Sequence, residues 1–319
     1  MSPLASIIIR CYNEEKHIGR LLSGIFAQNL NNIEVILVDS GSDDATLSIA
    51  SHYPVTNIRI EPEDFSFGYS LNKGCENASG EFLVFASAHV YPLYRDWLDR
   101  LLQPFENEKV ALSYGKQRGN SDTKYSEQQI FHKWFPDSSN LKQNSPFCNN
   151  ANAAIRRIIW EKEKYNEDLT GLEDLDWAKR IMTNGYGLSY VAEAEVIHVH
   201  EETIIGIFNR YRREAIALRN IYPDEYLTVW DVIKLTSANI FNDYIHASRE
   251  KVLLKNIINI PLFRLIQFIG GYRGGHQSEL VSGQLKEAFY YPRGVHKRTT
   301  TSNIEKNRID YSSINNPND

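Results

Sequence analysis

The fold is decided by the apolar run Ser6-Ile7-Ile8-Ile9 and by the polar stretch that follows it, Arg10-Cys11-Tyr12-Asn13-Glu14-Glu15. A short continuous apolar run bounded by polar residues predicts a strand that is buried on both faces. Asn13 is a good helix N-cap, and Glu14 and Glu15 would then lie in the first turn, where the helix dipole favours carboxylates. The helix itself is predicted from apolar residues at helical spacing: Ile18, Leu21, Leu22 and Ile25.

The same alternation continues along the first half of the chain. Further strands are predicted at 33–38, 56–60, 82–86 and 110–114, with helices near 45–52, 70–77 and 97–105. Strands and helices that alternate at this spacing predict an α/β fold, a mostly parallel sheet flanked by helices. In such sheets ligands bind beyond the carboxyl ends of the strands, so the loops after Ile9, Val38 and Ala86 are expected to meet at one site.

The second half is less regular. Residues 115–150 are polar and are expected to form a long loop or a short helix, followed by helices at 152–164 and 174–184, strands at 187–191 and 195–199, and a helical region from about 203. We therefore expect a sheet domain at 1–222 and a helical C-terminal region at 223–301. The tail at 302–319 has few apolar residues and is predicted to be disordered.

The net charge, the cysteines and the apolar stretches of the chain limit the classes of protein to which it could belong. The net charge of −5 argues against nucleic acid as a partner. The three cysteines, Cys11, Cys75 and Cys148, are far apart and form no paired motif, which indicates reduced thiols in the cytoplasm. The N-terminus has no signal-peptide pattern, and the longest apolar stretch, 257–271, is interrupted by polar residues and a proline, so no membrane span is expected.

Two strand ends carry side chains suited to a nucleotide. Asp39 follows a strand, where its carboxylate could accept hydrogen bonds from a base or a ribose; the neighbouring Ser42 and Asp43 are expected only to cap the next helix. His89 follows another strand and could bind a divalent ion or a diphosphate, although a lone histidine is more often structural. No G-x-G-x-x-G or G-K-[ST] loop is present, which argues against dinucleotide and P-loop folds.

Two later segments could carry chemistry. Gly171-Leu172-Glu173-Asp174-Leu175-Asp176-Trp177 places three carboxylates at the start of a helix, where they either stabilise the helix dipole or include a general base. Crowding and apolar neighbours would raise the pKa of such a base toward neutrality. In His198-Val199-His200 the two histidines would lie on one face of a strand, about 7 Å apart, either as surface residues or with one of them as a metal or phosphate ligand.

These segments together resemble glycosyltransferase family 2, whose members have the GT-A fold. Val38–Thr46 resembles the family's "VDDGSxDGT" segment, and Glu173-Asp174 resembles its catalytic "ED" pair. The resemblance spans roughly residues 5–220 and includes, in order, Ser6–Glu15, Val38–Thr46, Leu71–Gly74 with Ala78–Glu81, Glu173–Asp174 and Gly185–Tyr186. Three further segments are similar to a rhamnosyltransferase-like branch: Phe67-Gly68, Tyr114–Gln117 and Tyr272–Gly274.

The resemblance implies roles for individual residues. Asp174 would be the general base. The nucleotide would lie against Tyr12, Glu14, Asp39, Asn72 and Ala88. The acceptor side would be formed by Asn150, Asn152 and Trp177. The family's Asp-x-Asp metal motif aligns with Ser87-Ala88-His89, so a metal ion (Mn²⁺ or Mg²⁺) or the diphosphate itself would be held by His89 and His198.

The resemblance thus implies an inverting enzyme that moves a sugar from a nucleotide-sugar donor to a glycan or lipid-linked acceptor by direct displacement, as in polysaccharide assembly. The alternative is a non-catalytic sugar-nucleotide or glycan-binding relative that lost activity with its Asp-x-Asp motif. A nucleotidyltransferase is disfavoured because such an enzyme would have a glycine-rich, basic phosphate loop near the N-terminus. Here residues 10–15 contain no glycine and only one basic residue. The C-terminal region could form an acceptor lid, a homodimer interface or a peripheral contact at the inner face of the membrane.

Overall fold

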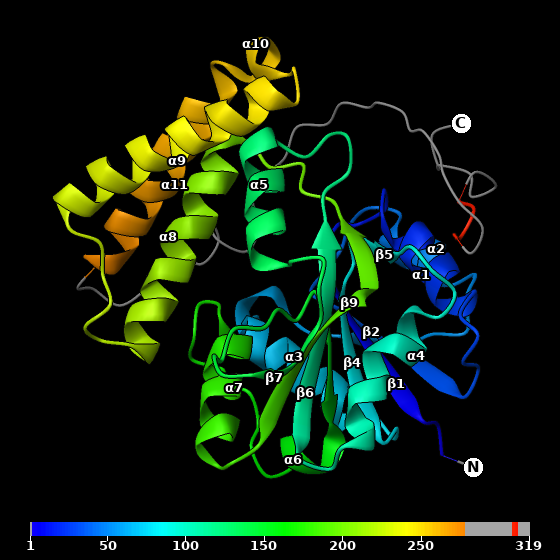
Figure 1. Ribbon diagram of the computed structural model, residues 1–319. Coiled ribbons are helices and arrows are strands. Elements are labelled where there is room, and N and C mark those ends of the chain that lie inside the picture. The colour runs from blue at the N-terminus through cyan, green and yellow to red at the C-terminus, as the bar shows by residue number, and fades with distance from the viewer. Residues whose placement is uncertain (1, 278–307, 312–319) are drawn as a thin grey trace.

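The computed structural model describes residues 2–277 and 308–311 (Figure 1). At its centre lies a mixed sheet in the order β3-β2-β1-β4-β8-β6-β9-β5, with β7 paired to β9 off this path. The strands are β1 (Ala5–Cys11), β2 (Ile33–Asp39), β3 (Thr56–Arg59), β4 (Phe82–Ser87), β5 (Val90–Pro92), β6 (Val110–Arg118), β7 (Asn140–Gln143), β8 (Asn152–Arg156) and β9 (Gly187–His198).

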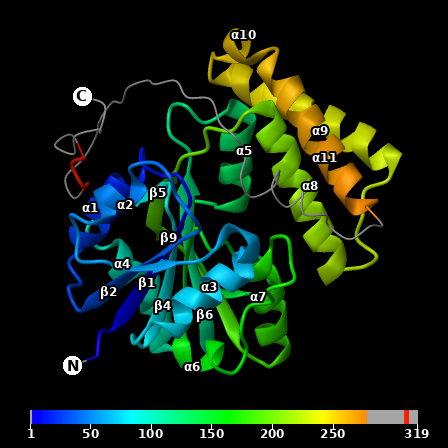
Figure 2. The ribbon, with the colours of Figure 1, turned by 180° about the vertical axis from the view of Figure 1, so that it is seen from behind.

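Helices cover both faces of this sheet (Figures 1 and 2). The α-helices are α1 (Ile18–Phe26), α2 (Thr46–Ala50), α3 (Phe67–Glu76), α4 (Trp97–Leu102), α5 (Tyr125–Trp134), α6 (Arg157–Trp160), α7 (Glu173–Thr183), α8 (Ile204–Ile221), α9 (Val229–Arg249), α10 (Leu253–Asn256) and α11 (Asn259–Gly275), with short 3₁₀ turns at Pro62–Asp64 and Gln103–Glu106. One apolar core packs α1, α2 and α4 against the sheet, and a second packs α3, α6 and α7 against the other face.

The parallel strands set the position of the site. Strands β1, β2 and β4 run in parallel, with Cys11 opposite Asp39 and Arg10 opposite Ser87. The loops that follow these strands therefore leave the sheet at the same edge, as the sequence predicts. The expected α/β architecture is confirmed, with β8, β5 and β7 as antiparallel members of the sheet.

The segment after β1 differs from the expectation. Asn13 has a left-handed backbone (φ 53°) and is not a helix cap, because α1 begins only at Ile18. Its side chain instead joins two loops: Oδ1 accepts from the backbone N–H of Asp43 at 2.9 Å, and Nδ2 donates to the Asp43 carboxylate at 2.8 Å. Asn13 thus fixes the loop after β1 to the loop after β2.

Two further expectations are wrong in detail. Residues 152–156 form β8 and not a helix, because this apolar stretch fills the gap between β4 and β6, and only 157–160 are helical. The two strands expected at 187–191 and 195–199 are one strand, β9, whose pairing with β6 shifts register after Gly115. The polar segment 115–150 contains α5 and β7.

The C-terminal helices form a separate layer beside α5 (Figures 1 and 2). Helix α11 lies directly on α8: a Cβ added at Gly274 would be 2.2 Å from the Arg212 carbonyl oxygen, so only glycine permits this approach. The buried Asp243 of α9 pairs with Arg264 of α11 at 2.8 Å and accepts from Ser126 of α5 at 2.7 Å. None of the described helices is both long and apolar enough to cross a membrane.

Part of the tail is placed against the sheet domain. Residue 308 pairs with Tyr94 as an isolated bridge, Ile309 is buried, and the Tyr311 hydroxyl donates to the Pro92 carbonyl oxygen at 2.7 Å. Residues 308–311 therefore differ from the expectation of a disordered tail, because a buried isoleucine and tyrosine hold them to β5. The rest of the predicted tail lies outside the described residues, as does the end of the 223–301 region.

Candidate active site

The carboxylate of Asp174 is buried in the first turn of α7. Its Oδ2 accepts from the Asn150 N–H at 3.0 Å, and its Oδ1 accepts from the Leu175 N–H at 2.8 Å. Burial and the adjacent Glu173 carboxylate raise the pKa of Asp174 to about 7. A carboxyl group whose pKa is raised toward neutrality is suited to accept a proton from a hydroxyl group.

Arg10 connects this carboxylate pair to the end of β1. Its guanidinium lies 3.2 Å from the Glu173 carboxylate and stacks over the Phe67 ring, 4.7 Å from the ring centroid. The backbone enters α7 through Leu172, which has a left-handed conformation (φ 54°) that a leucine adopts at an energetic cost. The resemblance gave Arg10 no role, although a cation at a strand's carboxyl end was visible in the sequence.

Asp39 is the last residue of β2, the strand next to β1. It is buried, and its carboxylate accepts from the N–H groups of Gly41 and Ser42, each at 3.1 Å, and from the Cys11 thiol at 3.6 Å. Arg10 is the neighbour of Cys11, so a short chain of contacts joins Asp39 to Glu173. The structure thus brings Asp39 and Asp174 to one edge of the sheet, and it gives Asp39 a role in shaping its own loop.

A cluster of three histidines occupies the next part of the same edge. His89 lies in the turn after β4, and His198 and His200 lie at the end of β9. The His89 and His198 rings stack with centroids 5.0 Å apart, and the His198 and His200 rings are 4.0 Å apart. Pairing of β5 with β9 creates this approach, because the Val199 N–H donates to the His89 carbonyl oxygen at 3.0 Å.

Charged groups surround the histidines unevenly. Burial alone would lower the pKa of His89, but the Glu14 carboxylate, 2.7 Å from its Nδ1, outweighs burial and raises that pKa. Burial and the two neighbouring imidazoles lower the pKa of His198 well below its usual value. Burial opposes ionisation of Glu127, but His200 and Arg210 lower its pKa to about 2.

The donor set of this cluster fits a divalent ion. One nitrogen from each of His89, His198 and His200 lies within 4.8 Å of the others. Imidazole nitrogens suit Mn²⁺ and the later transition metals better than Mg²⁺. The family resemblance gave no role to His200, Glu127 or Arg210. His200 could be identified in the sequence as the partner of His198. Nothing in the sequence pattern indicated that Glu127 of α5 and Arg210 of α8 would lie beside the histidines.

Four of the expected site residues have buried side chains that are engaged within the protein. Asn72 is buried with its amide fully used: Oδ1 accepts from Trp160 Nε1 and the Tyr165 N–H, and Nδ2 donates to Tyr165 O and Glu167. Asn152 is buried in the sheet and is equally saturated, by Trp97 Nε1, Lys116 O and Ala194 O. The side chains of Trp177 and Ala88 belong to the two apolar cores.

The remaining expected residues lie at the edge of the sheet. Tyr12 is half-buried directly after β1. Glu14 bonds to His89, so its first role is to hold that imidazole. Asn150 is buried beside the Glu173–Asp174 pair, donating through its backbone to Asp174 and through its amide to Glu173 at 3.5 Å.

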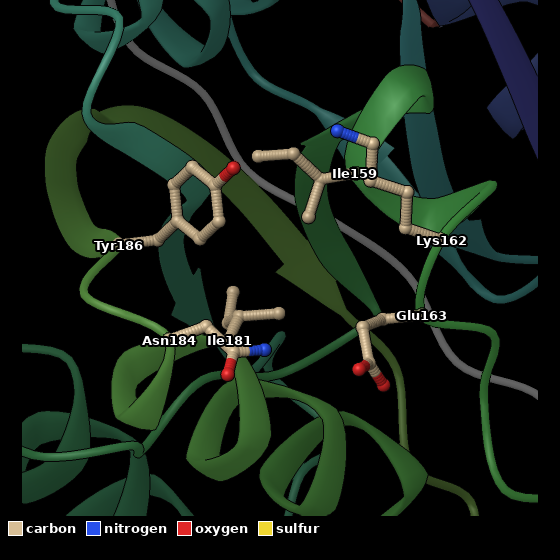
Figure 3. A pocket seen from close by; sticks show the side chains of 6 residues that line it. All are labelled: Ile159, Lys162, Glu163, Ile181, Asn184 and Tyr186. Atoms are coloured by element: carbon tan, nitrogen blue, oxygen red, sulfur yellow. The ribbon is translucent and has the colours of Figure 1, made fainter.

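A separate surface pocket lies at the other end of α7 (Figure 3). It has a volume of about 330 Å³, and Figure 3 shows the side chains that line it: Ile159, Lys162, Glu163, Ile181, Asn184 and Tyr186. Asp174 is in the first turn of this helix, whereas Ile181 and Asn184 are in and just beyond its last turn, roughly 10–15 Å away along the axis. The pocket is therefore distinct from the candidate active site.

Known proteins are similar to this chain in sequence. Residues 6–162 match the model of glycosyl transferase family 2. The chain is 31% identical over 190 residues to the O-antigen chain rhamnosyltransferase WbaN of Salmonella anatum, covering 56% of this chain and 60% of WbaN. It is 27% identical over 219 residues to the O-antigen chain rhamnosyltransferase RfbN of Salmonella typhimurium, covering 65% of this chain and 69% of RfbN.

Among solved structures, the fold is similar to that of the mannosyltransferase PcManGT from Pyrobaculum calidifontis in complex with GDP-Man and Mn²⁺. The TM-score is 0.57 at 17% identity, and the superposition covers 85% of this chain and 87% of PcManGT. The superposition shows a fold of the GT-A type. Through residues 6–162 the chain is similar to glycosyl transferase family 2, and it spans less than two thirds of the length of WbaN.

Proposed function

We propose that the protein transfers a sugar from a nucleotide-sugar donor to a glycan or lipid-linked acceptor with inversion at the anomeric carbon. The observation that carries the proposal is the buried Asp174 carboxylate, whose pKa of about 7 and position at the carboxyl edge of the sheet suit a general base. Asp174 accepts the proton of an acceptor hydroxyl as that oxygen bonds to the anomeric carbon. The bond from the anomeric carbon to the nucleoside diphosphate breaks on the opposite face, and the diphosphate leaves.

The donor side is supported by the histidine cluster. Negative charge develops on the leaving diphosphate, and a site for it needs a cation or hydrogen-bond donors. His89 and His198 are our candidates to hold the diphosphate or a divalent ion, which would supply positive charge at that position. The relative PcManGT is described with GDP-Man and Mn²⁺, which supports a nucleotide-sugar donor here. We keep Tyr12, Glu14 and Asp39 as the residues nearest the nucleoside.

The acceptor side is proposed from the relatives and the C-terminal helices. WbaN and RfbN are O-antigen rhamnosyltransferases, which supports a deoxyhexose donor and a polysaccharide acceptor assembled on a lipid at the cytoplasmic side of the membrane. Helix α9 exposes an apolar stripe at helical spacing, which we propose touches the membrane surface: Val229, Trp230, Ile233 and Phe241. The protein should cosediment with anionic vesicles, and the Trp230→Ser variant should not. If the stripe forms a homodimer interface instead, sedimentation velocity should show a dimer.

The experiment is a donor and stereochemistry test. Purified protein is screened by thermal shift against a panel of nucleotide sugars, with and without Mn²⁺, and the stabilising donor is incubated with a glycan acceptor. NMR should show a product whose anomeric configuration is opposite to that of the donor. Retention would contradict direct displacement. A donor that binds but is neither transferred nor hydrolysed would favour the non-catalytic alternative.

A further inference from the structure

The three clustered histidines are oriented by hydrogen bonds on their outer nitrogens. Each has its Nδ1 at 2.7 Å from an oxygen that belongs to a different element: His89 to Glu14, His198 to Gln117, and His200 to Glu127. The Gln117 amide is itself fixed with its oxygen toward His198, because its Nε2 donates to Asn149 Oδ1 at 3.1 Å. Carboxylate and amide oxygens only accept hydrogen bonds, so in each ring the proton lies on Nδ1.

This arrangement leaves lone pairs facing one another. With the proton on Nδ1, a neutral imidazole presents an unprotonated Nε2. The Nε2 atoms of His198 and His200 are 2.9 Å apart, a distance at which two lone pairs repel unless a metal ion or a shared proton lies between them. One nitrogen of His89 lies within 4.8 Å of both. A metal-bound histidine characteristically donates its other ring N–H to an acceptor of this kind.

We propose that His89, His198 and His200 together bind one divalent first-row transition-metal ion at the donor site. The inference rests on the proposed function, because the site is the one that would hold the donor diphosphate. Three imidazoles, including that of His200, would bind the ion there in place of the Asp-x-Asp carboxylates. The ring of His89 is about 29% exposed, which leaves one side of the cluster open to a diphosphate oxygen.

A neighbouring acidic group does not compete for the ion. Glu127 and Glu202, with His200, also lie within ligand distance of one another. Both carboxylates are already paired with Arg210, whose Nη2 is 2.6 Å from Glu127 and 2.7 Å from Glu202. Arg210 thus holds both carboxylates and offsets part of their negative charge, while Glu127 also supports His200 from outside the ligand set.

The donor set determines which metal binds. Three neutral nitrogen ligands suit Zn²⁺, Co²⁺ and Mn²⁺, with affinity increasing from Mn²⁺ to Zn²⁺, and they bind Mg²⁺ poorly because Mg²⁺ prefers oxygen. Neutral ligands also leave the full +2 charge of the ion facing the diphosphate, whereas two carboxylates would cancel it. Metal affinity should therefore depend on Glu14, which supports His89 from outside the ligand shell.

The test measures metal binding directly, on the full chain without a histidine tag. Isothermal titration with Zn²⁺, Co²⁺ and Mg²⁺ is combined with the visible absorption spectrum of the Co²⁺ form. We expect one Zn²⁺ or Co²⁺ per chain, no saturable Mg²⁺ binding, and nitrogen-ligand Co²⁺ bands. His89→Ala and His200→Ala should each weaken binding at least about 100-fold, and Glu14→Gln about 10–100-fold.

The control is His52→Ala, which removes an exposed histidine outside the cluster and should bind metal like the parent. Circular dichroism of each variant verifies folding, and His200→Gln replaces His200→Ala if the latter unfolds. Absence of Zn²⁺ and Co²⁺ binding, or affinity in His89→Ala and His200→Ala equal to that of the parent, overturns the inference and would mean that a proton links His198 and His200. If the metal site is absent but sugar transfer persists in the presence of chelator, the proposed transferase function still holds. If the protein binds metal but transfers no sugar, the metal site is supported and the transferase function is contradicted.

Discussion

Replacing Asp174 by asparagine should change how stability depends on pH. The folded-state pKa of Asp174 is about 7, compared with 3.8 in a free side chain, so the folded protein binds this proton more tightly than the unfolded chain does. A raised carboxyl pKa contributes stability that is complete below pH 4 and is lost as the pH rises through 7. Between pH 5 and the folded-state pKa of about 7 lie two pH units, and over each of them the free energy of unfolding falls by about 1.36 kcal/mol. The free energy of unfolding of the parent should therefore fall by about 3 kcal/mol between pH 5 and pH 9 because of this group.

The Asp174→Asn variant has no titrating group at this position and should lack that loss. It gives up one acceptor for the N–H of Asn150 or Leu175, a cost of about 1 kcal/mol that is the same at every pH. The free energy of unfolding is measured by urea denaturation at pH 5, 7 and 9 for the parent, Asp174→Asn and Asp176→Asn. Asp176 is paired with Arg180 at 3.0 Å, and its variant keeps Asp174, so it should follow the parent's slope. Parallel pH profiles for all three proteins would refute the raised pKa and the argument built on it.

Three further outcomes follow from the contacts. Arg10→Ala removes a positive charge that lowers the pKa of Asp174, so the acid limb of the kcat/KM profile should move to higher pH; an unmoved limb would separate Arg10 from the base. Asn72→Ala should lower the free energy of unfolding by about 3 kcal/mol without changing the Kd for donor, and a weaker Kd in the folded variant would restore its nucleotide role. Ile309→Ala should lower the free energy of unfolding by about 2–3 kcal/mol because Ile309 is buried; an unfolding curve equal to that of the parent would contradict the packing of 308–311.

Much of the fold can be predicted from the sequence because the buried strands are recognisable as continuous apolar runs. Continuous apolar runs such as 6–9 and 33–38 have one stable place, inside a sheet covered on both faces, and β1 and β2 lie side by side as that predicts. Residues 153–155 are also apolar, yet helix and strand periods cannot be told apart over so short a run, and only the gap between β4 and β6 decides for a strand.

The site was predictable where chemistry and local pattern coincide. Glu173-Asp174 at a helix start needs no distant partner to be recognised, and the structure adds Arg10 as the link to β1. Asn72 shows the limit of this reasoning, because an asparagine beside a nucleotide loop and an asparagine saturated by Trp160 look the same in sequence. The three-histidine cluster depends on the pairing of β5 with β9, a contact between residues more than 100 positions apart that no local motif encodes.

The central claim is that Asp174 takes the proton of the attacking hydroxyl. The most direct test is the rate of sugar transfer at saturating donor for Asp174→Asn beside Asp176→Asn, with donor Kd measured for both. We predict a loss of about 10²–10⁴-fold in Asp174→Asn with donor Kd unchanged, and a rate within a few-fold of the parent in Asp176→Asn. Transfer by Asp174→Asn at the parental rate would contradict the account.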